Sequence, residues 1–343
     1  MRTKKPILII LGEPNSVFIE LLSKVLNKKK VKKKINRPII LIGSENLILA
    51  QLKTLKKKIN FEKINKNNFK LNKLSRKTYL INVNYNFKKA FEKISIKSKD
   101  YISNCFDIGL KILNSNQSKI IINGPISKKH FLENKYPGIT EYIFYKSPKK
   151  ISKYPTMLIF NNNLSVSPTT THIPLKLVSK KIKMKNIINN ALNINHFYKK
   201  YLRTKPRIAL MGLNPHCESR YKNNEEEKII QPAIKKLKLK KININGPHST
   251  DTFFIRKNLN YYDSIIGMYH DQVLTPFKTM YGFDASNITL GLPFLRLSVD
   301  HGPNEAMMGK NKSNTKSLEN IFNFISTVKW KLFQKNHLDK IFY

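Results

Sequence analysis

Short apolar runs bounded by turn residues alternate along the chain with stretches of helical periodicity. Runs of this length predict buried strands, and apolar residues spaced three and four apart predict amphipathic helices. We expect strands at residues 6–12, 38–43, 119–123, 206–213 and 263–269. Helices are expected at residues 17–28, 97–114, 184–202, 225–239 and 316–335. This alternation is typical of an α/β fold.

Two local patterns refine this layout. Residues 155–171 predict a β-hairpin that turns near residues 161–163, and Ser44 is placed to cap the helix that follows it. Residues 55–95 are rich in Lys and Asn without a clear period, so we assign no element there. The length of 343 residues allows one large domain or two modest ones.

No apolar run approaches the ~18 residues that a membrane span requires. The apolar stretch near the N-terminus ends at Gly12-Glu13-Pro14, which indicates a first strand rather than a signal peptide. Cys105 and Cys217 lie far apart and form no Cys-x-x-Cys motif, which argues against a disulfide framework. These features favour a cytoplasmic protein without a membrane partner.

The formal net charge of +43 raises the question of a nucleic-acid partner. Only eight of the 64 basic residues are Arg, the side chain preferred for bidentate contacts with phosphates and bases. Lys is instead scattered with Asn and Ile through almost every segment, as a biased coding composition would produce. We interpret the charge as a solvated surface and expect no nucleic-acid partner.

Three histidines, His172, His216 and His270, each come just after an apolar, strand-like run. In open α/β sheets, functional residues lie at the carboxyl ends of the strands. A catalytic metal site typically has three protein ligands and one open coordination position. A single histidine in such a setting is more often a structural residue. Cys217 and Asp271 are possible extra ligands, although Cys217 also fits a small buried hydrophobe.

Lys278, Asn287 and Arg296 follow at wide intervals among apolar, Gly and Pro residues. A buried cation needs a partner, and a phosphate or carboxylate would satisfy the guanidinium of Arg296. A solvated position is the competing interpretation for Lys278, as for most Lys here. Asp251 suits a helix N-cap or first turn, and it is an equally good candidate for a group that acts on a proton.

Several motifs follow one another along the chain: NGPISK (123–128), TTTHIPL (169–175), GLNPH (212–216), EE..II.PAI (226–234), GPHSTDTFF (246–254), MYHDQ (268–272) and NITLGLPFLRLSVDHG (287–302). In their order and spacing the chain resembles the 4-hydroxythreonine-4-phosphate dehydrogenase family. The resemblance covers residues 97 to about 330, with a weaker N-terminal anchor in Gly12-Glu13-Pro14.

This resemblance implies the fold of the isocitrate and isopropylmalate dehydrogenases, with approximate subdomains at 1–125 with 280–343 and at 126–279. It implies NAD- and metal-dependent oxidation and decarboxylation of a small phosphorylated hydroxy-amino acid in pyridoxal phosphate synthesis. A homodimer with its active site at the subunit interface is expected. The metal would be Zn, Mg, Mn or Co.

The family's functional residues fall on matching positions of this chain. Its metal ligands are expected at His172, His216 and His270. Its substrate contacts are expected at Thr140, Lys278, Asn287 and Arg296, with Lys278 and Asp251 as catalytic candidates. His301 and Gly302 begin the segment that approaches NAD in related enzymes.

The chain departs from the family pattern at several positions. Ile139 stands where the family has a substrate-contacting His, and we expect its side chain to face the substrate pocket. Gly-rich stretches of the family are replaced at residues 15–18 and 218–221, and bulkier side chains occupy the loop at 303–309. These departures leave two alternatives open: a different phosphorylated or acidic hydroxy acid as substrate, or a metal-binding homologue that has lost turnover.

Overall fold

The structure, a computed structural model, describes residues 4–65, 74–133, 135–218 and 222–328. The chain divides into two compact units. Unit 1 consists of Met1–Lys149 and Tyr281–Ser326, and unit 2 is built mainly from Lys150–Met280. The chain passes from unit 2 back to unit 1 near residue 280, and residues 126–149 belong to unit 1.

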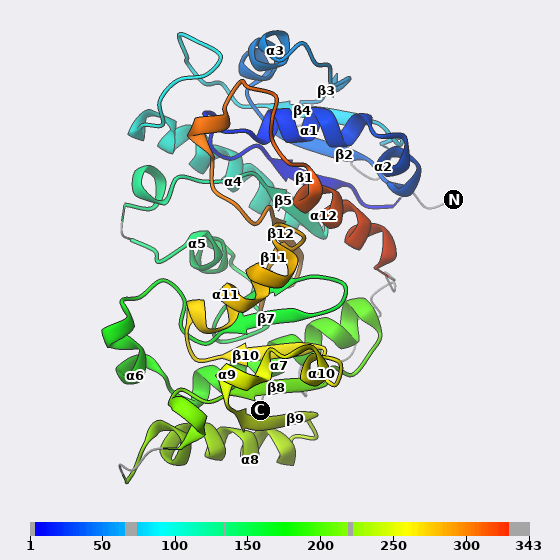
Figure 1. The fold of residues 1–343 in the computed structure, drawn as a ribbon. Helices are drawn as coiled ribbons and strands as arrows, with labels where there is room; N and C mark the ends of the chain where they lie inside the picture. The colour runs from blue at the N-terminus through cyan, green and yellow to red at the C-terminus, as the bar shows by residue number, and fades with distance from the viewer. Residues whose placement is uncertain (1–3, 66–73, 134, 219–221, 329–343) are drawn as a thin grey trace. The chain divides into compact units, whose positions relative to one another are not determined.

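Unit 1 is built on a sheet whose strands run in the order β3-β4-β2-β1-β5-β12-β11 (Figure 1). All neighbours in this order are parallel except β11, which runs antiparallel to β12. Its strands are β1 (Ile7–Ile10), β2 (Ile39–Gly43), β3 (Glu62–Lys63), β4 (Thr78–Asn82), β5 (Ile120–Asn123), β11 (Ser286–Leu290) and β12 (Leu295–Ser298). The continuous Ile and Leu runs of β1, β2 and β5 are fully buried, as expected of parallel strands covered on both faces.

The helices of unit 1 bury apolar stripes against this sheet. They are α1 (Phe18–Asn27), α2 (Lys29–Lys34), α3 (Glu45–Thr54), α4 (Lys99–Asn114), α5 (Ile139–Lys146) and α12 (Lys316–Thr327), with short turns η2 (Ile96–Ser98), η3 (Lys128–Leu132) and η8 (Glu305–Met307). Ser44 caps α3 as predicted, because its side chain accepts a hydrogen bond from Leu47 N at 3.4 Å. The expected helix at 316–335 is confirmed up to Thr327, and its part from residue 329 lies outside the described residues.

Unit 2 contains strands in the order β6-β7-β10-β8-β9. These are β6 (Thr156–Phe160), β7 (Ser165–Pro168), β8 (Ile208–Met211), β9 (Ile244–His248) and β10 (Ser264–Gly267). The predicted hairpin is confirmed, since β6 pairs antiparallel with β7 and Asn161 N bonds Leu164 O at 2.9 Å. Strands β7, β10, β8 and β9 are mutually parallel, so their carboxyl ends meet at one edge.

The helices of unit 2 are α6 (Val178–Lys181), α7 (Met184–Phe197), α8 (Gln231–Leu239), α9 (Thr250–Phe253), α10 (Arg256–Leu259) and α11 (His270–Tyr281), with turns η4 (Leu175–Leu177), η5 (Tyr198–Leu202), η6 (Pro215–Cys217) and η7 (Glu226–Ile230). The predicted helices at 184–202 and 225–239 are confirmed, with π-helical turns η5 and η7 included. Among the described helices, none combines the length and apolar character that crossing a membrane requires.

Candidate functional site

Three histidines follow the ends of three neighbouring parallel strands in unit 2. His172 follows β7, His270 follows β10 and His216 follows β8, and β10 lies between the other two strands. The ring centroids of His172 and His270 are 5.4 Å apart, with the ring planes tilted by 43°. Each of the three histidines thus follows a strand of the same parallel set, and their role as metal ligands stays a prediction.

His216 and Cys217 both adopt left-handed backbone conformations, with φ of 57° and 58°. Residues other than glycine rarely adopt this region, and such positions collect at functional sites. His216 Nδ1 lies 3.8 Å from Asp251 Oδ2, and both side chains are more than half exposed. His270 Nδ1 lies 2.6 Å from Asp271 Oδ1. Each of these two histidines thus has a carboxylate within reach, although water weakens such exposed pairs.

A buried carboxylate shapes the turn that carries His216. Glu226 is 1% exposed, and its Oε1 accepts hydrogen bonds from Leu213 N at 2.7 Å and Asn214 N at 2.9 Å. Its Oε2 accepts a further bond from Asn214 Nδ2 at 2.7 Å. Because all these donors precede His216 directly, Glu226 fixes the path of the chain into the left-handed turn.

Gln272, in the first turn of α11, links the ends of strands β10 and β8 to the start of helix α9. Its Oε1 accepts a hydrogen bond from Met268 N at 2.6 Å, after β10. Its Nε2 donates to Gly212 O at 2.6 Å, after β8, and to Thr250 Oγ1 at 3.0 Å at the start of α9. Sequence reasoning missed both Gln272 and Glu226. Their presence inside the MYHDQ and EE..II motifs was the available signal.

Asp251 lies in the first turn of α9, where the helix dipole favours a negative charge. A hydrogen bond from the Ser249 hydroxyl is the main cause that lowers the pKa of Asp251, and proximity to His216 lowers it further. A cavity of about 250 Å³ opens beside this helix and is lined by residues including Ser249, Thr252 and Tyr261. Asp251 therefore combines the first-turn position with contact to a candidate metal ligand.

Within the described ranges, no three His, Cys, Asp or Glu side chains gather closely enough to form a ready-made metal centre. The structure brings His172 and His270 together as one pair, and His216 and Asp251 as another. All four side chains nonetheless lie at the carboxyl edge of the same parallel strands.

Arg296 is the largest fully buried side chain of the described residues and lies on β12 of unit 1. Its Nε donates to Asn123 Oδ1 at 2.8 Å, and its Nη1 donates to Thr289 Oγ1 at 3.0 Å. Among the described residues, Arg296 Nη2 has no hydrogen-bond partner. Burial lowers the pKa of Arg296 to about 9, which the nearby carboxylate of Glu141 opposes. A guanidinium fixed at two nitrogens with a third left open is built to receive an anion.

Two other predicted substrate contacts lie in the same unit. Thr140 is buried in the first turn of α5, and its hydroxyl accepts a hydrogen bond from Thr289 Oγ1 at 3.3 Å. Asn287 lies on β11 beside β12, and its buried Oδ1 is another atom without a partner among the described residues. Arg296, Thr289 and Thr140 thus form one hydrogen-bonded chain. Asn123 and Thr289 were not singled out by the sequence.

Ile139 begins α5 and is partly buried. Its side chain packs against the hydrophobic core of unit 1, which includes Phe131, Tyr142 and Phe144. The sequence placed this side chain in the substrate pocket. That expectation stays a prediction beside this core contact, to which an isoleucine at the start of a helix is drawn as an apolar side chain.

The remaining predicted residues are Lys278 in unit 2 and His301 and Gly302 in unit 1. Lys278 is half-buried in the last turn of α11, and burial lowers its pKa to about 8. His301 and Gly302 follow β12, and His301 Nδ1 lies 2.9 Å from Gly302 O. A side chain at Gly302 would meet no neighbour within 4 Å among the described residues, so the chain is open there.

In the divergent 303–309 loop, Asn304 adopts a left-handed φ of 58°. Of the divergent 218–221 stretch, residues 219–221 lie outside the described residues.

The α/β fold, the imidazoles at one strand edge and the buried arginine with an open nitrogen define a class of protein. They are the parts of an α/β enzyme that handles an anionic substrate. The comparisons with known proteins narrow this class.

A family profile described as pyridoxal phosphate biosynthetic protein PdxA matches residues 34–325. The chain is 35% identical over 316 residues to a 4-hydroxythreonine-4-phosphate dehydrogenase of Sulfurihydrogenibium sp. (strain YO3AOP1), which covers 90% of this chain and 94% of the relative. It is 31% identical over 228 residues to the D-threonate 4-phosphate dehydrogenase of Salmonella typhimurium (strain LT2), which covers 65% of this chain and 69% of the relative.

A crystal structure of a 4-hydroxythreonine-4-phosphate dehydrogenase from Burkholderia phymatum shares the fold. Its TM-score is 0.75 at 24% identity, with 95% of this chain and 99% of that chain covered. The chain belongs to the PdxA family of pyridoxal phosphate biosynthetic proteins. The predicted family, α/β fold and oxidoreductase class are thereby confirmed.

Proposed function

We propose that the protein catalyses the NAD-dependent oxidation and decarboxylation of 4-phosphohydroxy-L-threonine to 3-amino-2-oxopropyl phosphate in pyridoxal 5'-phosphate biosynthesis. Family membership and the name of its Sulfurihydrogenibium relative support this substrate. The observation that carries the proposal is the fully buried guanidinium of Arg296 with its open Nη2. Its Nη2 keeps one donor that an anion can fill, and a phosphorylated acid supplies such an anion.

The substrate-binding roles follow from charge and hydrogen-bonding capacity. Arg296 and Lys278 supply positive charge for the phosphate, with Arg296 held in orientation by Asn123 and Thr289. Asn287 offers an amide oxygen that has no partner among the described residues. The hydroxyl of Thr140 is oriented by its hydrogen bond from Thr289. A cation that is positioned before the substrate arrives loses little entropy on binding.

His172, His216 and His270 would hold one divalent metal ion, Zn, Mg, Mn or Co. The donor chemistry fits, because imidazole suits Zn and related ions, and the three histidines follow neighbouring strands. When bound, the ion would supply Lewis-acid polarisation of the substrate hydroxyl. Asp251 and Lys278 are the proposed proton-transfer groups. The lowered pKa of Asp251 favours its ionised form, the form that accepts a proton, and at the same time makes it a weaker base.

NAD would take the hydride, since protein side chains offer no equivalent acceptor. His301 and Gly302 are its proposed contacts, and the open surroundings of Gly302 support a close approach of the cofactor. We propose a homodimer with its active site at the subunit interface, without nucleic-acid or membrane partners. A cytoplasmic location suits the free thiols of Cys105 and Cys217.

A second substrate is favoured by one specific observation. The Salmonella relative, 31% identical to this chain over 228 residues, is named for D-threonate 4-phosphate. The purified protein should be assayed for NADH formation with both phosphorylated acids, each with and without added divalent metal. We expect a higher kcat/KM for 4-phosphohydroxythreonine. A higher kcat/KM for D-threonate 4-phosphate would transfer the assignment to the second substrate. Metal binding without NADH formation from either acid would indicate lost turnover.

A further inference from the structure

The connection from Val299 to Thr315 joins β12 to α12 in unit 1 and contains His301 and Gly302. Its only regular structure is the short turn η8. Connections of this length inside a compact unit are uncommon, and those that are ordered usually serve a function. This 299–315 segment is bonded to α1 at several points. Near its start, Val17 N donates to Pro303 O at 3.2 Å.

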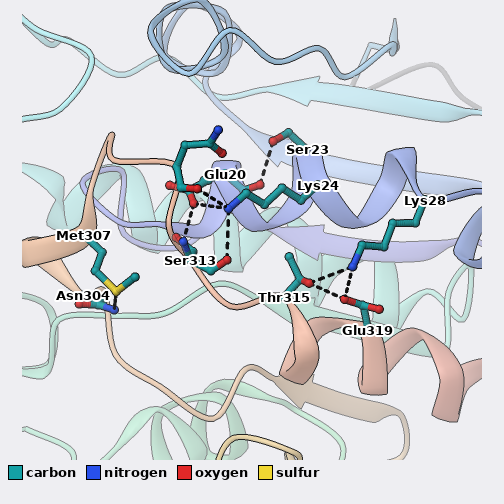
Figure 2. A network of polar contacts seen from close by, with 10 residues as sticks. Glu20, Ser23, Lys24, Lys28, Asn304, Met307, Ser313, Thr315 and Glu319 are labelled. Atoms are coloured by element: carbon teal, nitrogen blue, oxygen red, sulfur yellow. Dashed lines mark hydrogen bonds and ion pairs between the residues drawn. The ribbon is translucent and has the colours of Figure 1, made fainter.

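Lys24 of α1 makes the central attachment. Its ammonium donates to Glu20 Oε1 at 2.7 Å, to Asn311 O at 2.9 Å and to Ser313 O at 3.2 Å. Figure 2 shows the Lys24 side chain reaching from α1 to Glu20 and to the backbone near Ser313. An ammonium has three donors, so these bonds use its full capacity.

Glu20 completes the attachment from the other side. Its Oε1 also accepts a hydrogen bond from Ser313 N at 2.7 Å, and the residue is only 1% exposed. Burial opposes the charge of Glu20, yet the bonds from Lys24 and Ser313 outweigh it and lower the pKa of this carboxyl. Glu20 and Lys24 therefore bond both the N–H and the C=O of Ser313.

A second lysine on α1 provides a contrast. One turn further along, Lys28 donates to Glu319 Oε1 at 2.6 Å and to Thr315 Oγ1 at 3.1 Å (Figure 2). The side chains of Lys28 and Glu319 are 45% and 28% exposed. Lys28 contacts the segment at the side chain of Thr315, its last residue before α12. The Glu20–Lys24 pair instead bonds the backbone of the segment itself, with its carboxylate almost completely buried. Buried pairs depend on both partners, whereas exposed pairs contribute little.

We propose that Glu20 and Lys24 form a positioning pair that fixes the 299–315 segment, and with it His301 and Gly302, in the conformation that receives the dinucleotide. The inference rests on the proposed NAD dependence. Helix α1 is anchored by its buried apolar face, so it is a rigid reference for this segment. The segment also carries the large side chains of Met307 and Met308.

The test compares Lys24→Gln with the matched control Lys28→Gln, each in the full-length protein. Steady-state kinetics with NAD and 4-phosphohydroxythreonine should show an approximately tenfold higher KM for NAD in Lys24→Gln. The KM for the phosphorylated acid should stay within about twofold, and Lys28→Gln should match the unmodified protein in both constants. Glu20→Gln keeps an acceptor for Ser313 N but removes the charge, and it replaces Lys24→Gln if that variant does not fold.

Amide hydrogen exchange and calorimetric titration with NAD give readouts that need no turnover. We expect faster exchange of amides 304–313 and weaker NAD binding in Lys24→Gln, with exchange in β1 and β5 unchanged. Equal exchange in the Lys24 and Lys28 variants would overturn the inference, and so would faster exchange with unaltered NAD affinity. If the unmodified protein neither binds nor reduces NAD, the proposed function fails, and the role in cofactor positioning fails with it. The exchange contrast would then report the structural anchor alone.

Discussion

At the scale of single residues, burial sets the charge of the two proposed substrate cations. It lowers the pKa of Arg296 to about 9 and that of Lys278 to about 8. Arg296 therefore stays protonated at neutral pH. Lys278 begins to lose its proton when the pH rises slightly above neutral. A cation with a depressed pKa is poised to gain from a bound phosphate, because the anion stabilises its charged form.

This difference predicts a pH dependence of substrate capture. Lys278 is charged below its pKa and neutral above it, so kcat/KM for the phosphorylated substrate should fall as the pH rises through about 8. Lys278→Arg should be less active, because arginine cannot transfer the proton, and its residual kcat/KM should not fall near pH 8, because the guanidinium stays protonated. Steady-state kinetics from about pH 6 to about pH 10 would check both curves. A constant kcat/KM across pH 8 in the unmodified protein would contradict the role of Lys278.

Glu13 predicts a pH dependence of stability. It is 1% exposed, and burial raises its pKa from 4.5 to about 7. Between these values the folded chain binds more protons than the unfolded chain, so the Glu13 contribution to stability is lost as the pH rises from about 4.5 to about 7. Glu13→Gln has no such loss. Its free energy of unfolding, relative to that of the unmodified protein, should rise on the order of 3 kcal/mol across this window. Urea unfolding at both ends of the window measures it, and a pH-independent difference would contradict the account.

At the scale of elements, the parallel strands β7, β10, β8 and β9 gather the candidate metal ligands. Removing one ligand from the proposed site leaves too few donors for tight binding. His172→Ala, His216→Ala and His270→Ala should each lower bound Zn²⁺ and reduce activity by at least about a hundredfold. Metal analysis and NADH assays measure both effects, with His130→Ala as a control histidine in unit 1. Full metal content after loss of two of the three histidines would show that the site is elsewhere.

Helix α5 gives a prediction that separates core packing from substrate contact. Ile139 packs against the core of unit 1, so Ile139→His should lower the free energy of unfolding by about 1–3 kcal/mol. We expect no large gain in kcat/KM for 4-phosphohydroxythreonine. Thermal melting and kinetics of this variant test both statements. A gain of about tenfold with unchanged melting would instead mean that position 139 faces the substrate, as a restored hydrogen bond would produce.

The elements also show what a sequence can and cannot predict. The apolar runs predicted β1, β2, β5, β8 and β10 because buried parallel strands depend on a local pattern. Helix α11 was missed because Pro276 lies inside it and Lys, Thr and Tyr leave a weak stripe. The histidines at the strand edge followed from the strands. Gln272, Glu226 and Asn123 could not be found in this way, since their roles depend on partners far away in the chain.

At the scale of the whole molecule, family membership supports a metabolic enzyme, and we interpret the net charge of +43 as a solvated surface. Arginine, the more selective phosphate ligand, occurs only eight times in the chain, and one of these residues is the buried Arg296. The central claim is therefore an oxidation coupled to decarboxylation, and not binding of a polyanion.

The most direct test measures NADH and carbon dioxide together from carboxyl-labelled 4-phosphohydroxythreonine, using the purified protein with NAD and divalent metal. The account predicts that both form in equal amounts, that chelation stops both, and that added metal restores both. NADH without carbon dioxide would contradict the decarboxylation. Formation of neither product, with metal and NAD both bound, would contradict the assignment of a working dehydrogenase.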